Sequence, residues 1–159
     1  MESVMNRTTR EQSRLAIQAA GHAVAGLAIG LSIEKLSIHP ENGLDARILF
    51  DLDSKNPSND EWLTIALSGA AAESKWTNLD KAADLSRLAF DGGESIAEEL
   101  EKFPESKRAE KLQQATERAT KVIAYNFHLV ERLRTELKNS NEVSSYTLGR
   151  ILKHNSIYS

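Results

Sequence analysis

Gln18 and His22 lie four residues apart in a stretch that is otherwise built from small and apolar residues. If this stretch is a helix, the two side chains project from one face, one turn apart. The motif His-Glu-x-x-His uses the same spacing to hold zinc between two imidazoles, with the Glu as general base for peptide hydrolysis. Here Gln18 takes the place of the first His, and Ala19 takes the place of the Glu. Of the three groups that this chemistry needs, His22 supplies one.

The residues around this stretch resemble the peptidase domain of the FtsH-like ATP-dependent zinc proteases. In that family the helix reads His-Glu-Ala-Gly-His-Ala, and residues 18–23 agree with it at the last four positions. Residues 33–43 resemble the strand and turn that follow in the family, and residues 67–74 resemble its Gly-Gly-Arg-Ala-Ala-Glu helix. The resemblance extends over nearly the whole chain from about Thr9, and it implies an FtsH-like peptidase-domain helical fold.

The same resemblance gives a position to Asp84. The third zinc ligand of the family is the Asp of an Asn-Asp-Leu sequence that opens a helix, and residues 83–85, Ala-Asp-Leu, fall at the corresponding distance. The pocket that the resemblance implies therefore consists of Gln18, Ala19, His22 and Asp84. The ATPase module of the family is not expected here, because no Gly-rich loop ending in Lys-Ser or Lys-Thr occurs in the sequence.

That pocket has too few donor groups for hydrolytic zinc chemistry, which needs three protein ligands and a position left for water. The neutral amide of Gln18 is a poor zinc ligand, so His22 and Asp84 remain. Loss of a general base alone costs ~100- to 10,000-fold in rate. We therefore predict a degenerate pocket without a catalytic residue or a bound metal. We interpret His22 as a core histidine bonded to Gln18 or Asp84, and a rebuilt site that adds His39 is the alternative.

Composition limits the class of protein. A chain of 159 residues with 40% hydrophobic residues predicts a single domain over 1–159, with an ordered core over about 9–153. The net charge of -3 and the scattered basic residues argue against a nucleic-acid partner. The absence of cysteine excludes disulfides and thiolate metal sites, and cytoplasm is the default location. We expect no membrane segment, because residues 15–33 are too short and are interrupted by polar groups.

The first half of the chain predicts two helices and two strands. Residues 8–11 have a capping-box pattern, so we expect a helix from there to about Leu31. Alternating apolar residues predict strands over 33–38 and 46–50. Ser58 and Glu61 form a second capping box, which predicts a helix that ends near Trp76.

The second half is predicted to be helical. Asp80 is placed to cap the helix that carries Asp84. Apolar residues at intervals of three and four predict one long amphipathic helix over 105–138. An Asn-Ser-Asn sequence at 139–141 interrupts it, and a last helix is expected from Ser144 or Ser145 through Leu152. The predicted fold class is mainly α with a small β-sheet.

Three functions follow as hypotheses. The first is a non-catalytic relative of the FtsH-like peptidases that binds a protein or peptide partner, because strand addition needs no metal. The second is a residual zinc-dependent metallopeptidase of the same family. The third is a structural or oligomer-forming module in which the long helix packs between subunits.

Overall fold

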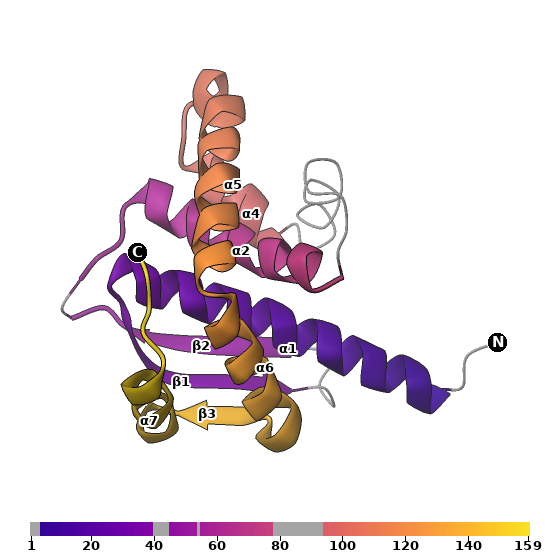
Figure 1. Cartoon of the computed structure of the whole chain (residues 1–159). Coiled ribbons are helices and arrows are strands. Elements are labelled where there is room, and N and C mark those ends of the chain that lie inside the picture. Colours follow the sequence, from indigo (N-terminus) through magenta and orange to yellow (C-terminus); the bar gives the residue numbers. More distant parts are fainter. Residues whose placement is uncertain (1–3, 40–44, 54, 78–93) are drawn as a thin grey trace.

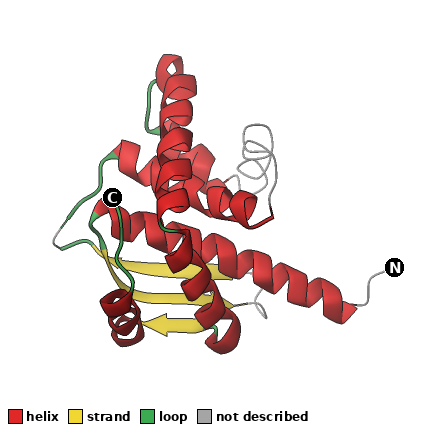
Figure 2. Cartoon of the chain, viewed as in Figure 1, coloured by secondary structure: helices red, strands yellow, loops and turns green. Residues whose placement is uncertain are grey.

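The computed structural model describes residues 4–39, 45–53, 55–77 and 94–159. Most of these residues are helical, and three short strands form one antiparallel sheet, so the predicted class of a mainly α fold with a small sheet is confirmed (Figure 2). The elements in chain order are α1 (Val4–Ile29), β1 (Ser32–His39), β2 (Asp45–Asp51), α2 (Asn59–Thr77), α4 (Glu94–Glu101), η2 (Glu105–Lys107), α5 (Arg108–Tyr125), α6 (Phe127–Ser140), β3 (Glu142–Ser144) and α7 (Ser145–His154).

Helix α1 is the central element of the fold. It runs between α2 on one side and the sheet on the other, and it also packs against α6 (Figure 1). Its small residues permit a close approach, as the sequence predicts. A Cβ added to Gly21 would lie 2.5 Å from the carbonyl oxygen of Ser68 and 2.7 Å from the Cβ of Ala72. Since this neighbour is backbone, only glycine fits at position 21 without a shift of α2.

The sheet has the strand order β2-β1-β3. The two strands predicted from alternation are confirmed as β1 and β2, which pair from Ser32 with Asp51 to His39 with Asp45. Leu36 and Ile38 of β1 are 1% exposed and belong to the same core cluster as Val24 of α1. The third strand was not predicted, because three residues are too few to show a period of two.

The predicted capping box at the start of α2 is confirmed. The backbone N–H of Glu61 donates to Oγ of Ser58 at 3.2 Å, and the N–H of Ser58 donates to Oε1 of Glu61 at 3.1 Å. The last helix is also capped as predicted, because Oγ of Ser144 accepts from the N–H of Thr147 at 3.2 Å. Polar side chains at helix starts are reliable signals because they satisfy backbone donors that have no partner within the helix.

Both predicted ends of α1 are wrong by a few residues. The helix begins at Val4 rather than at the 8–11 capping pattern, and threonine inside a helix costs only roughly 0.7 kcal/mol or less relative to alanine. The helix ends at Ile29 rather than Leu31, because Gly30 has a φ of 107°. The N–H of Leu31 bonds to the carbonyl of Gly26 at 2.9 Å, and that of Gly30 to Leu27 at 3.0 Å. This pair of bonds is a Schellman motif, which a glycine favours.

The single long helix predicted over 105–138 is also wrong. A short 3-10 turn, η2, comes first, and the remainder is divided into α5 and α6 at Asn126. Asn126 is 0% exposed, with a φ of -118° and a ψ of 20°. Its side-chain amide donates to the carbonyls of Val122 at 2.8 Å and Tyr158 at 2.7 Å. Periodicity alone misses this break because the apolar stripe continues through it.

The predicted helix that follows Asp80 and carries Asp84 lies outside the described residues. Within the described part of the chain, no helix has the length and apolar character needed to cross a membrane.

Candidate functional site

Gln18 and His22 both face α2. Together with Arg14 they form a row at four-residue spacing along one face of α1. The residues that they contact, Ile65, Gly69 and Glu73, form a matching row along α2. Side chains four apart make the ridges by which helices commonly interlock. The face of α1 that carries Gln18 and His22 is therefore a helix-packing surface.

Glu73 is the polar centre of this surface. This carboxylate is only 5% exposed, and its neighbours in the sequence are small residues. The side-chain amide of Gln18 donates to its Oε2 at 2.9 Å, and Nε of Arg14 forms an ion pair with its Oε1. A buried carboxylate is stable when hydrogen-bond donors and an opposite charge surround it. Gln18 thus bonds to Glu73 and not to His22, while Asp84, the other predicted partner of His22, lies outside the described residues.

His22 is half-buried and has a hydrogen bond to the backbone of α2. Its Nδ1 lies 2.7 Å from the carbonyl oxygen of Ile65. Because a carbonyl oxygen can only accept, Nδ1 carries a proton, and in the neutral ring Nε2 has the lone pair. Burial lowers the pKa of His22 below its ordinary value of 6.5, and the bond to Ile65, which acts in the opposite direction, does not cancel this. Burial therefore favours the neutral form of the ring.

Nε2 of His22 lies against Gly69. A Cβ built on Gly69 would meet Nε2 at 2.4 Å and Cε1 at 2.6 Å. The ring is held between the Ile65 carbonyl and this glycine, as a packed side chain would be. Among the described residues, Nε2 has no hydrogen-bond partner.

The described residues do not fit a hydrolytic zinc site. Gln18 donates its amide to Glu73, Ala19 is buried and brings no polar side chain, and His22 is a single imidazole. In the described ranges there is no group of three His, Cys, Asp or Glu side chains arranged to hold a metal ion. Asp84 lies outside these ranges, so the four-residue pocket as a whole stays a prediction.

His39 lies in a different part of the molecule. It follows Leu36 and Ile38 on β1, but it alternates with them and so faces away from the core that α1 covers. Its Nε2 lies 3.1 Å from Oγ of Ser37. We therefore do not propose a zinc site rebuilt from His22 and His39.

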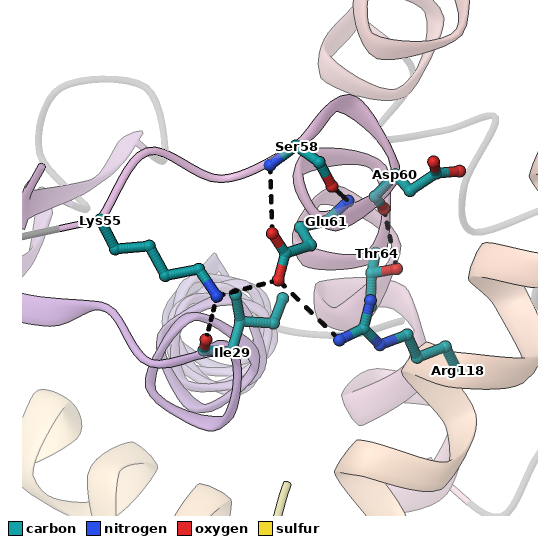
Figure 3. Close-up of polar contacts among 7 residues, drawn as sticks. All are labelled: Ile29, Lys55, Ser58, Asp60, Glu61, Thr64 and Arg118. Carbon is teal, nitrogen blue, oxygen red and sulfur yellow. Dashed lines mark hydrogen bonds and ion pairs between the residues drawn. The ribbon is translucent and has the colours of Figure 1, made fainter.

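A second polar centre joins the end of α1, the start of α2 and the middle of α5 (Figure 3). Nζ of Lys55 donates to the carbonyl of Ile29, the last residue of α1, at 2.6 Å and to Oε2 of Glu61 at 3.1 Å. Arg118 of α5 approaches the same Glu61 oxygen at 4.0 Å. Burial alone would raise the pKa of Glu61, but the Ser58 N–H, Lys55 and Arg118 outweigh it and lower this pKa. The cluster connects α1, α2 and α5.

Two hollows adjoin these elements. A small one of about 200 Å³ lies beside the Glu61 cluster, between α2 and α5, where Lys111 is ion-paired with Asp60 at 3.0 Å. A larger one of about 660 Å³ lies on the sheet; we call it the sheet hollow, and its lining residues are Lys35, Ser37, His39, Ala46, Arg47, Ile48 and Leu49. Leu49 is 55% exposed.

Comparison with known proteins adds no relative. No protein-family model matches the chain, and no curated protein matches it. The resemblance to the FtsH-like peptidases stays a prediction from the quoted motifs.

Sequence reasoning missed Glu73 and Arg14. The signal for Glu73 is a single carboxylate within the apolar run 67–74, which requires a partner if the helix is buried. Arg14 lies one turn before Gln18, so it was the nearest candidate cation on the same face.

Proposed function

We propose that this chain is a non-catalytic relative of the FtsH-like zinc peptidases and binds an extended peptide segment of a partner protein. The proposal rests on the sequence resemblance for its family and on the contacts of α1 and α2 for its lack of catalysis. The sheet supplies the proposed binding surface.

The observation that carries the proposal is the hydrogen bond between Gln18 and Glu73 at 2.9 Å. At the position of the first zinc ligand in the resembling family, this chain has an amide that stabilises a buried carboxylate. A histidine at that position would compete for the same carboxylate. The bond therefore supports a packing role, and not a catalytic one, for this face of α1.

The sheet hollow has the chemistry to receive a peptide. Among the described strands, β2 pairs with β1 alone, so its other edge presents backbone donors and acceptors. An extended peptide adds to such an edge through main-chain hydrogen bonds, and side-chain pockets select its sequence. Lys35, which is half-exposed and ion-paired with Glu142 at 3.5 Å, brings a positive charge that favours an acidic side chain, and exposed Leu49 favours an apolar one. We expect a peptide in which an acidic and an apolar residue are two positions apart, because Lys35 and Leu49 lie opposite each other on one face of the sheet.

Catalysis is tested with purified protein. After dialysis against chelator and then zinc, we expect the same zinc content in the unaltered chain and in the variant His22→Ala, and no cleavage of a mixed peptide library. One zinc per chain that disappears in His22→Ala, together with cleavage, would show a working peptidase and overturn the proposal.

Peptide binding is tested with a labelled array of acidic-apolar decapeptides. The variant Leu49→Asp places a negative charge in the sheet hollow, so we expect affinity for the bound peptides to fall at least about tenfold. The matched control is Tyr146→Asp on α7, where the side chain is 75% exposed and the packing contacts are with β1 and β3. Equal binding by the two variants, or no bound peptide, would contradict a binding role for β2.

A further inference from the structure

A buried side chain that bonds to extended main chain lies at the break between α5 and α6. Its centre is Asn126, whose side chain is fully buried. Asn126 provides no side-chain cap for α6, although it occupies the capping position. Its amide instead extends to residues after α7, which lie 32 positions further along the chain.

The amide of Asn126 pairs with the main chain of Tyr158 on both sides. Nδ2 donates to the carbonyl of Tyr158 at 2.7 Å, and Oδ1 accepts from the N–H of Tyr158 at 2.7 Å. A neighbouring β-strand would satisfy the same two groups in this way. The contact therefore binds extended peptide backbone, and it does not depend on the side chain of the paired residue.

His128 adds contacts on the first turn of α6. Its Nε2 lies 3.1 Å from the carbonyl oxygen of Ser156, and its ring meets that of Tyr158 edge to face at 6.4 Å between centroids. Between these two residues, Ile157 packs partly buried against the main core cluster. The site thus receives an apolar residue followed by an aromatic one, in addition to backbone.

The segment that fills this site lies partly at the surface. Tyr158 is 56% exposed, and the contact between His128 and Ser156 is exposed, whereas the two bonds to Asn126 are part-buried. Solvent-exposed bonds mark the parts of a protein that open most readily. Undocking would leave the amide of Asn126 with its bond to Val122 alone among the contacts described here, and an amide that has lost these partners favours a replacement.

We propose that Asn126 and His128 form a docking site for an extended peptide that carries an apolar residue followed by an aromatic one. Residues 156–158 fill this site in the free protein and exchange with such a segment of a partner. A tethered segment has an effective concentration of order mM, so it competes strongly with any peptide that arrives from outside. The site is separate from the sheet hollow and does not depend on the proposed function.

The test opens the site within the full chain. In the variant Tyr158→Pro the tethered segment loses the N–H that Asn126 accepts. The probe is a fluorescent hexapeptide with the sequence of residues 154–159, followed by anisotropy. We expect the probe to bind Tyr158→Pro at least about tenfold more tightly than the unaltered chain. Circular dichroism establishes that the variant has the helical content of the unaltered chain.

The control changes the probe and leaves the protein intact. A hexapeptide that is N-methylated at its tyrosine amide cannot donate to Asn126, so we expect it to bind Tyr158→Pro at least about tenfold more weakly than the plain probe. The substitution His128→Ala, at an exposed position, should weaken the plain probe as well. Equal binding of both probes, or equal binding by the variant and the unaltered chain, would overturn the proposal, and so would a helical variant that binds neither probe. The substitution Leu49→Asp should leave probe binding unchanged, which separates this site from the sheet hollow.

Discussion

Gly69 lies directly against the imidazole of His22, and a Cβ at position 69 would come within 2.4 Å of Nε2. The contact joins the two helices at the point where the resembling family would have a metal ligand. It makes the position of the His22 ring depend on the volume of the residue opposite. Packing, rather than coordination, is what the described contacts of this ring provide.

The substitution Gly69→Ala is expected to destabilise the protein by roughly 1 to 3 kcal/mol, because an added methyl in a filled interface forces its neighbours to shift. The ring would have to leave its bond to Ile65 to make room. The measurement is urea unfolding followed by circular dichroism. The control is Gly149→Ala on α7, where a Cβ meets nothing within 4 Å. This change should be neutral or stabilising by roughly 0.5 to 1 kcal/mol, and a similar gain at Gly69 would contradict the packing argument.

The substitution Gln18→Leu removes a donor from buried Glu73. Loss of a hydrogen bond to a buried charged group costs about 1.5 to 3 kcal/mol, so we expect unfolding at a lower urea concentration by a corresponding amount. Gln113→Leu, at an exposed position on α5, is the matched control and should change the free energy of unfolding by less than about 0.5 kcal/mol. If the two variants are equally stable, the bond between Gln18 and Glu73 contributes nothing to the fold.

Local signals were enough to predict much of the fold. Ser58 and Glu61 satisfy each other's backbone donors within four residues, so the start of α2 could be read from sequence. The break at Asn126 could not be predicted in this way. The buried side chain at the break bonds to Tyr158, 32 residues away, which no window of neighbouring residues contains.

In the candidate site, too, local features could be predicted and long-range partners could not. The missing groups at Gln18 and Ala19 are visible in the sequence, and so is the spacing that places Gln18 and His22 on one face. Their partners were not predicted, because Glu73 is 55 positions from Gln18 and is brought to it by the packing of α1 on α2. A sequence pattern shows on which face of a helix a residue lies, but not which residue of another helix packs against it.

His22 makes stability depend on pH near neutrality. Its pKa is lowered in the folded protein, so the unfolded chain, with the ordinary value of 6.5, binds the proton more readily. Stability therefore rises with pH through the window between the folded pKa and 6.5, and falls as the pH drops through it. One such group changes the free energy of unfolding by at most about 1.4 kcal/mol per pH unit. Urea titrations at pH 5.5, 6.5 and 7.5 should show this dependence in the unaltered chain and a flatter one in His22→Gln. Parallel profiles would rule out His22 as the source.

Glu61 has the opposite dependence in acid. Its pKa is lowered below 4.5 in the folded protein, so the carboxylate stabilises the fold above that value and the contribution is lost as the pH falls through the folded pKa. We expect Glu61→Gln to cost about 1 kcal/mol at pH 7, with a smaller cost at pH 3 and in high salt. The exposed Glu117→Gln on α5 serves as the control. A cost at Glu61 that is the same at pH 3 and pH 7 would contradict a charge-based role.

The tight fit of α1 against α2 has a consequence for how ancestry can be judged in this chain. Ala20, Gly21, His22 and Ala23 are the letters that agree with the peptidase motif, and each of them either is buried or touches a neighbour across the interface. Packing alone is enough to restrict these four positions, because larger side chains there would meet the facing helix. Gln18 and Ala19 are restricted in the same way, since Gln18 bonds to Glu73 and Ala19 is 1% exposed, so agreement with the motif at these positions reflects how the two helices fit together and is not by itself a sign of past chemistry.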